Sequence, residues 1–430
     1  MLLQHRELFT KLQSLSDYDP HAMTEQELLN SALSADKSVK WGKLKESVVA
    51  DGKRFFIDRE TQKRGEWPAV VHNNYIVGTE GKRQRFVNTS LWMLDSDSEC
   101  KPFPLFNMPR GPREGTEMSL VIKVLAYNRP QALLRLFESL LRVDFLGDHV
   151  TIDIYVDGPS DDVTDDVDSL LDRAKVLRMA ELFRWPHGHK RVIDRPTNVG
   201  LAGQWLNSWH PIGQGELAWF LEDDNVAAEG AYRYIKAAAK HFYFDQSRFD
   251  PRLFGIALQA QHVIAGDYPA RPRDRLAEGT RFYKYQLLST WGPVFFPAAW
   301  SDFCTWQSEK GKEFKPLFSN LVTNDWYVSR GGKSVWSTWF IRYAAERGMY
   351  ALYTNYEDGA AFVANYRDKG VNYGEAKGVN SGVVEGFNEG HVDFPGEIPV
   401  YDFHFNEIRE DTRVLEGRGL YADIFNIETH

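Results

Sequence analysis

The 430-residue chain contains few cysteines and no long hydrophobic run. Its 2 cysteines, Cys100 and Cys304, stand far apart, which excludes a CxxC redox pair, a zinc ribbon and a multi-disulfide scaffold but leaves one disulfide open. Residues 1–20 lack the apolar core of a signal peptide, and no window approaches the roughly 20 apolar residues of a membrane span. We therefore expect a soluble chain without a membrane span.

The chain also contains fewer positively than negatively charged side chains. With 51 Lys+Arg against 60 Asp+Glu the formal net charge is −9, so no global field favours nucleic acid or an anionic membrane. The 43% hydrophobic and 26% charged residues are typical of a globular protein, and the length corresponds to two or three domains or one large enzyme core with appendages. The compartment stays open between the cytoplasm and the Golgi or secretory lumen.

A linker is predicted around residues 95–117, where acids, prolines and glycines interrupt any periodicity. We divide the chain there into an N-terminal extension (1–116) and a main domain (117–384), followed by an aromatic and acidic C-terminal tail (385–430).

Apolar strands alternate with helical patterns in the main domain. Residues 119–126 read as a strand, followed at Pro130 by a helix, and strands are also predicted at 150–156, 190–194 and 217–224. This alternation predicts an α/β fold with a mainly parallel, doubly wound sheet, in which ligands bind beyond the carboxyl ends of the strands.

Three adjacent carboxylates, Glu222, Asp223 and Asp224, end the last of these strands. Neighbouring carboxylates repel one another unless a cation or solvent compensates them. Mg²⁺ or Mn²⁺ takes oxygen ligands, often only one or two carboxylates together with substrate phosphates. The segment therefore predicts a metal–diphosphate site, and the alternative is a solvated acidic turn before the next helix.

Polar residues also follow the other strands. Asp157 closes the strand at 150–156, Asn198 and Gly200 precede a helix, and Asn128 and Arg129 form the first strand-to-helix turn. Helix N-terminal amides favour phosphate, and glycine lets the backbone approach a ligand closely. A guanidinium could meet a phosphate or a base edge, although Arg129 could equally be a surface arginine.

These segments together resemble the GT-A fold of glycosyltransferases, in particular family-2-like enzymes and the N-acetylglucosaminyltransferase I group. The resemblance covers about residues 118–245 and is carried by "VIKVLAYNRP", "IYVDGPSDD", "RPTNVGLAGQW" and "WFLEDDNVAAEGAYRYI". It implies a nucleoside-diphosphate sugar as donor, a UDP-sugar foremost, a glycan or glycoconjugate hydroxyl as acceptor, and Mn²⁺ or Mg²⁺ as cofactor.

The same resemblance implies roles for single residues. Asp157 would lie near the base, Glu222 and Asp223 near the ribose and the donor sugar, and Asp224 would be the direct metal ligand. A metal there offsets charge on the leaving diphosphate. The Trp-Gly segment of related enzymes resembles Trp291 and Gly292, which would form a floor for a sugar; core packing is the alternative.

An inverting transfer needs a carboxylate that removes the acceptor proton. We choose Asp325 in "TNDWYVS", because N-acetylglucosaminyltransferase I carries its base in a comparable acid-Trp context. Its rivals are Asp302 and Glu309, a surface role is also open, and a retaining enzyme would not require this base.

A late histidine often serves GT-A enzymes as a second metal ligand. Of His391, His404 and His430, we select His404, which aromatic residues flank in "YDFHFNE". A structural histidine is the alternative. The basic segment 271–275 could cover the diphosphate or be solvated loop charge.

The stretch from residue 67 to residue 94 resembles the closing segment of plant-type family 77 nucleotide-diphospho-sugar transferases, in which His72 would be the metal-side histidine. No DxD strand precedes it. The extension is therefore expected to be the remnant or fragment of another transferase, or a packing extension of the main domain.

Two further functions stay open. A sugar nucleotidyltransferase would need a Gly-rich, basic loop after the first strand, which "AYNRPQ" lacks. A catalytically silent sugar-binding or scaffold protein could keep the fold, since fold alone does not guarantee chemistry. Loss of the acids would indicate such a silent protein, but Asp157, Asp223 and Asp224 are all present.

Overall fold

The computed structural model describes residues 111–408 and some short stretches between residues 49 and 82; the gaps within the main range are 160–166, 311–313, 319–320, 333–334, 357, 370–374 and 388–391. The chain divides into two compact units, Met1–Thr61 with Glu66–His72, and Gln62–Gly65 with Asn73–His430. In the first unit β1 (Val49–Asp51) pairs in parallel with β2 (Val70–His72), which ends at His72.

Several predictions fall on residues that are not described. Most of the linker, most of the segment that resembles family 77, His391 and the end of the tail with His430 lie outside the described residues. The division into extension, main domain and tail stays a prediction.

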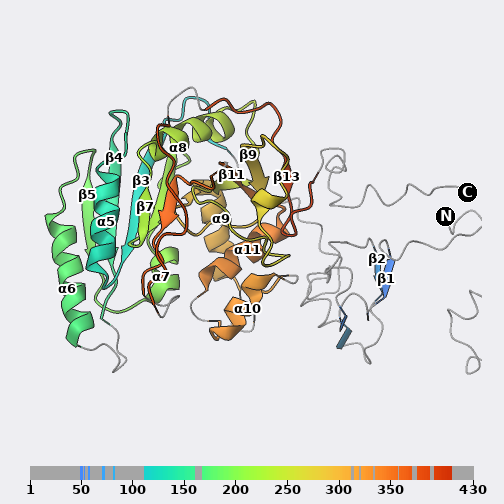
Figure 1. Cartoon of the computed structure of the whole chain (residues 1–430), viewed down its shortest axis with the longest axis horizontal. Coiled ribbons are helices and arrows are strands. Elements are labelled where there is room, and N and C mark those ends of the chain that lie inside the picture. Colours follow the sequence, from blue (N-terminus) through green and yellow to red (C-terminus); the bar gives the residue numbers. More distant parts are fainter. Residues whose placement is uncertain are drawn as a thin grey trace, which may run out of the picture. The chain divides into compact units, whose positions relative to one another are not determined.

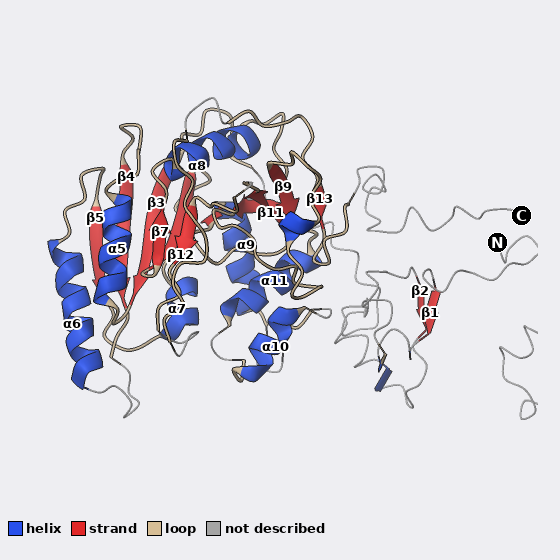
Figure 2. Ribbon diagram, viewed as in Figure 1, coloured by secondary structure: helices blue, strands red, loops and turns tan. Residues whose placement is uncertain are grey.

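A large mixed sheet forms the centre of the second unit (Figures 1 and 2). Its strand order within the described residues is β13 (Val400–Tyr401), β9 (Phe282–Tyr285), β11 (Tyr350–Thr354), β8 (Leu253–Ile256), β10 (Val294–Phe295), β6 (Glu216–Glu222), β3 (Ser119–Ala126), β4 (Val150–Val156) and β5 (Lys190–Asp194). Strands β6, β3, β4 and β5 are parallel neighbours, and β10 is antiparallel to both β6 and β8. The predicted α/β fold with a mainly parallel sheet is confirmed.

Two hydrophobic cores lie on opposite faces of this sheet. Along β3, Ile122 and Val124 belong to one core, whereas Val121 and Leu125 belong to the other, because successive side chains of a strand point to opposite faces. Residues of α5 (Pro130–Leu140), α6 (Val167–Leu182) and α8 (Ala231–Ala239) join the first core; those of α7 (Gly200–Leu206), α9 (Pro297–Ser308) and α11 (Trp336–Glu346) join the second. The sheet is therefore doubly wound, as predicted.

Local sequence explains the connection that leads to the site. Pro130 occupies the first turn of α5, where its missing N–H costs nothing. Leu133, Leu136 and Leu140 recur at helical spacing and are fully buried. Figure 1 shows α5 and α6 side by side over the β4–β5 side of the sheet. The turn from β3 into α5 is thus short and leaves no room for a glycine-rich loop.

A second small sheet lies close to the end of β6. Strand β7 (Asn225–Ala227) follows the acidic segment directly and pairs in antiparallel fashion with β12 (Val363–Asn365), as Figure 2 shows. This pairing sets Asn365 opposite Asn225.

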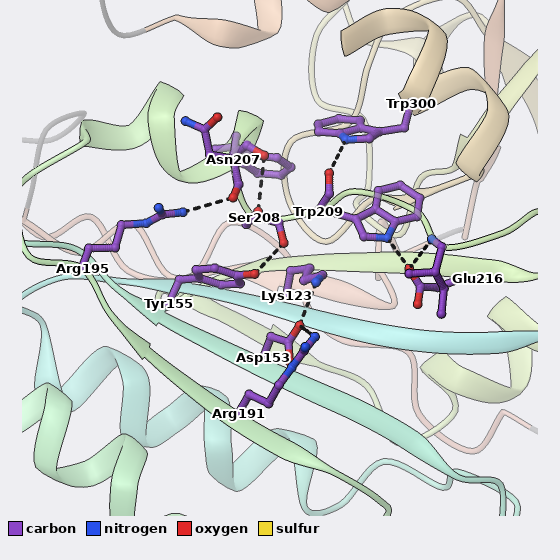
Figure 3. A network of polar contacts seen from close by, with 12 residues as sticks. Lys123, Asp153, Tyr155, Arg191, Arg195, Asn207, Ser208, Trp209, Glu216 and Trp300 are labelled. Carbon is purple, nitrogen blue, oxygen red and sulfur yellow. Dashed lines mark hydrogen bonds and ion pairs between the residues drawn. The ribbon is translucent and has the colours of Figure 1, made fainter. Parts of the chain in front are cut away.

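A charged row crosses the parallel strands at Lys123 of β3, Asp153 of β4 and Arg191 of β5, which are paired in register. Figure 3 shows both cations converging on Asp153. Lys123 Nζ lies 2.7 Å from Asp153 Oδ2, and Arg191 donates to both carboxylate oxygens at 2.6 Å. Burial lowers the pKa of Lys123, and the hydrogen bond and charge of Asp153 oppose this.

Removing the carboxylate of this row is expected to destabilise the fold strongly. Asp153→Ala leaves the Lys123 ammonium buried without its partner, which costs about 3–5 kcal/mol in the free energy of unfolding. The Arg191 side chain is 65% exposed, so Arg191→Gln as the control should cost less than about 1 kcal/mol. Urea denaturation measures both; equal losses in the two variants would contradict this account.

Candidate active site

The candidate site is built where β3, β4 and β6 end at one edge of the sheet. Backbone hydrogen bonds fix two of its acids to the end of β3: Asp223 N donates to Leu125 O at 3.0 Å, and Asp157 N donates to Ala126 O at 2.9 Å. Glu222, Asp223 and Asp224 follow the fully buried run from Leu217 to Leu221, so they stand at the end of a rigid strand.

Arg129, at the turn between β3 and α5, binds two of these acids at once. Its Nη1 donates to Asp224 Oδ2 at 2.8 Å, its Nε lies 3.3 Å from Asp223 Oδ2, and its Nη2 donates to Asp223 Oδ1. Although burial opposes it, the charges of Asp223 and Asp224 raise the pKa of Arg129. The guanidinium is therefore a permanent cation between β3 and β6.

The other oxygen of Asp224 is held by two amides. Asp224 Oδ1 accepts hydrogen bonds from Asn365 Nδ2 at 2.8 Å and from Asn225 Nδ2 at 3.3 Å. The backbone carbonyl of Asp224 also accepts from Tyr366 N at 2.8 Å. Asn365 lies 141 positions away in the sequence and was not among the predicted site residues. Its short segment "FVAN" carries no local pattern that indicates a site.

The three acids carry more negative charge than the arginine compensates. Burial, reinforced by the neighbouring carboxylates, raises the pKa of Glu222 to about 8 although Arg129 opposes it. Burial likewise raises the pKa of Asp224 to about 6, and it raises that of Asp223. Glu222 also accepts a hydrogen bond from Trp205 Nε1 at 3.1 Å. Additional positive charge at this point would therefore be stabilising.

The oxygen donors at this edge fit a hard divalent ion. Within the described residues no three His, Cys, Asp or Glu side chains are arranged so that they could hold a metal ion by themselves. Asp224 and the side-chain amide oxygen of a neighbouring asparagine would supply only two protein ligands. Mg²⁺ uses such a small set when substrate phosphates supply further oxygens. Charge and ligand type thus fit such an ion, provided that a phosphate ligand completes the site.

Asp157 caps the start of α7. Its Oδ1 accepts from Gly158 N and Val199 N, and its Oδ2 accepts from Gly200 N, all at 2.9 Å. Asn198 Nδ2 donates to Gly158 O at 2.9 Å. The helix-terminal amides that were expected to favour phosphate therefore bind this carboxylate, and contact of Asp157, Asn198 or Gly200 with a donor stays a prediction.

A cleft of about 870 Å³ opens between α5 and α6, and Asn128 and Arg129 form part of its wall. Asn128 Nδ2 donates to Ser169 Oγ at 2.7 Å, which links the turn after β3 to α6. The other basic side chains that line the cleft are Arg135, Lys175, Arg178 and Lys369. Asp172 and Asp368 also line the cleft and form ion pairs with Lys175 and Arg135, so part of its positive charge is neutralised. Arg129 contacts both the acids and the wall of this cleft.

The Trp-Gly segment packs against β12. Gly292 has a φ of +67°, and a Cβ there would lie 2.5 Å from Val363 Cγ2, so only glycine fits. The half-buried Trp291 donates its backbone N–H to Gln259 Oε1 at 2.9 Å. The segment therefore supports the strand that carries Asn365, and its contact with a sugar stays a prediction.

The predicted base and the predicted second metal ligand lie on other elements. Asp325 is exposed in the first turn of α10 (Val322–Ser329). Of its rivals, Asp302 binds Tyr343 and Arg347, and Glu309 follows α9. The buried His404 lies against Gly266, 3.2 Å from its carbonyl oxygen. The catalytic role of Asp325 and the metal role of His404 both stay predictions.

Comparison with known proteins gave matches only among solved structures. No protein-family model matches the chain, and no curated protein sequence matches it. A structure of TarS 1-349 from S. aureus is 16% identical over 43% of this chain and 49% of that chain, with a TM-score of 0.28. The same fragment in complex with UDP-GlcNAc is 14% identical over 43% and 47%, with a TM-score of 0.27.

A third similar structure is the mannosyltransferase PcManGT from Pyrobaculum calidifontis in complex with GDP-Man and Mn²⁺. It is 14% identical over 54% of this chain and 58% of that chain, with a TM-score of 0.29. The matches thus span about half the length of each of these chains. Among the described residues, no helix has the length and apolar character needed to cross a bilayer.

The raised pKa values predict a definite pH dependence of stability. Glu222 and Asp224 bind protons more tightly when folded than their ordinary values of 4.5 and 3.8 allow in the unfolded chain. Their contribution is therefore complete at low pH and is lost as the pH rises through 6 and 8. Thermal melts between pH 5.5 and 9 without divalent cations should show a falling midpoint.

Glu222→Gln should flatten the upper part of this decline, whereas the exposed Glu278→Gln should leave it unchanged. A midpoint that rises between pH 6 and 9, or a Glu222→Gln profile that parallels the unchanged protein, would show that the acids are better compensated than the pKa values indicate.

Proposed function

We propose that this protein is a metal-dependent glycosyltransferase that transfers a sugar from a nucleoside-diphosphate donor, a UDP-sugar foremost, to a hydroxyl of a glycan or glycoconjugate with inversion. One observation carries the proposal: Arg129 joins an undercompensated acidic segment at the end of a parallel strand to the wall of a cleft that further basic side chains line. Such an edge suits a ligand that brings phosphates together with a divalent cation.

Asp224 is the proposed protein ligand of the cation, Mn²⁺ or Mg²⁺. A cation bound there would stabilise the charge on the departing diphosphate as a Lewis acid. Asp223 and Glu222 lie beside it and are proposed to face the ribose and donor sugar. Arg129, a permanent cation on the wall of the cleft, is proposed to bind phosphate as well as the acids.

The acceptor side of the proposal rests on Asp325. Inversion requires one carboxylate that takes the proton of the attacking hydroxyl. Asp325 is exposed on α10, next to Trp326, whose side chain is also exposed. An aromatic face beside a carboxylate suits an acceptor sugar, because the ring can pack against the apolar face of a pyranose.

A silent sugar-binding or scaffold protein is the second candidate, and Arg129 favours it. A guanidinium that holds Asp223 and Asp224 together could serve as a purely structural ion pair that permanently fills the place of a cation. The nucleotidyltransferase alternative receives no such support, because β3 runs into α5 through "YNR" without glycine.

Loss of the Asp224 carboxylate is expected to abolish donor turnover. Asp224→Asn should lower kcat/KM for a UDP-sugar at least about a hundredfold, because a lost metal ligand removes several kcal/mol of leaving-group stabilisation. Asp245→Asn, an exposed-turn variant, serves as the control. Turnover in saturating Mn²⁺ is measured after a thermal-shift screen of UDP-, GDP-, CMP- and dTDP-sugars with and without Mn²⁺ has identified the donor.

If Asp224→Asn retained full activity, Asp224 would not be the ligand of a catalytic metal ion. No thermal shift with any pair of nucleotide sugar and Mn²⁺ would favour the silent scaffold.

The Asp325 side chain is expected to affect the transfer step without affecting donor binding. Asp325→Asn should lower kcat by about 10²–10⁴-fold, the usual contribution of a general base, while the Kd for the donor stays constant. Asp393→Asn, at an exposed loop position outside the candidate site, is the matched control. Unchanged kcat in Asp325→Asn, or a comparable loss in Asp302→Asn alone, would assign the base elsewhere.

A further inference from the structure

In the described part of the chain, only the NH₂ group of the Asn365 side chain forms a hydrogen bond, and the amide oxygen forms none. Its Nδ2 donates to Asp224 Oδ1 at 2.8 Å. Its Oδ1 is buried and has no hydrogen-bond partner in the described part of the chain. The residue as a whole is 3% exposed, so bulk water does not compensate for the missing bond.

The orientation of this amide is fixed by its neighbours. The backbone N–H of Asn365 donates to Asn380 Oδ1 at 2.8 Å, and its carbonyl accepts from Asn380 N at 2.9 Å. The ionised Asp224 carboxylate can only accept, so its Oδ1 requires the NH₂ end of the amide. A flipped amide would set two oxygens against each other, and the oxygen of Asn365 therefore stays the unused end.

An unsatisfied buried oxygen costs free energy and calls for an explanation. Asn365 touches the carboxylate that lies in an excess of negative charge, and an amide oxygen is a neutral ligand of the kind that Mg²⁺ and Ca²⁺ accept. A divalent cation at Asp224 would give this oxygen a partner without adding further negative charge.

We propose that Asn365 belongs to the cation site, where its NH₂ group positions Asp224 and its Oδ1 serves as a neutral second ligand. The inference rests on the proposed metal-dependent function and deepens it. Asn365 then takes the role of second metal ligand that was predicted from the sequence for His404, because His404 lies against Gly266 whereas Asn365 binds Asp224 directly. A neutral oxygen ligand also favours Mn²⁺ or Mg²⁺ over Zn²⁺.

The test measures Mn²⁺ binding to the full chain by electron paramagnetic resonance of free Mn²⁺, with UDP present, independently of turnover. Asn365→Ala should raise the Kd for Mn²⁺ by about 10–100-fold, as loss of a ligand or its supporting partner does. Asn355→Ala is the matched control, because the Asn355 side chain binds Thr280 O instead. His404→Gln should leave the Kd unchanged.

Asn365→Asp provides a second readout that does not depend on tolerance of the alanine variant. The new carboxylate has the same shape but faces Asp224, so the melting temperature without cation should fall. Mn²⁺ should then raise the melting temperature of Asn365→Asp by more than it raises that of the unchanged protein. If Asn365 had only a structural role, Asn365→Asp would lower the melting temperature, and Mn²⁺ would raise it by the same amount as in the unchanged protein.

An unchanged Kd in Asn365→Ala, or a loss of Mn²⁺ binding in His404→Gln alone, would overturn the role of Asn365 and leave the proposed function intact. Absence of Mn²⁺ binding by the unchanged protein would overturn this role together with the metal dependence.

Discussion

The charge balance among Arg129, Glu222, Asp223 and Asp224 is the constraint on which the site depends. One guanidinium binds two of the three carboxylates at the end of a buried strand, and burial raises the pKa values of all three. The fold tolerates this because a protonated acid or an added cation relieves the repulsion. Under the proposed function, the same imbalance that costs stability would provide affinity for a cation and for the phosphates that accompany it.

The sheet places these groups with little freedom. Parallel pairing of β6 with β3 brings Asp223 to the end of the strand that leads into Arg129, and Pro130 begins α5 immediately afterwards. On the other side of the acids, pairing of β7 with β12 brings Asn365 to Asp224. Both counter-groups thus depend on backbone pairing, which holds them more firmly than mobile surface loops would.

Much of this arrangement could be predicted from sequence, because it is encoded locally. Apolar runs and helical spacing predicted β3, α5, β4 and β6. The three adjacent acids at residues 222–224 formed a recognisable motif. The partners of these acids could not be predicted. Asn365 is 141 positions from Asp224 and meets it only through β7–β12 pairing, and the capping of α7 by Asp157 likewise depends on how two strand ends meet. Such contacts have no local pattern.

We propose above all that Glu222, Asp223 and Asp224 form a cation-dependent donor site and not a closed structural ion pair. A crystal structure of the protein with UDP and Mn²⁺, with anomalous scattering recorded for manganese, tests it most directly. The account predicts a manganese peak bonded to Asp224 and to the diphosphate, with Arg129 released from at least one carboxylate. UDP bound without manganese while Arg129 still holds Asp223 and Asp224, or no bound UDP at all, would contradict it.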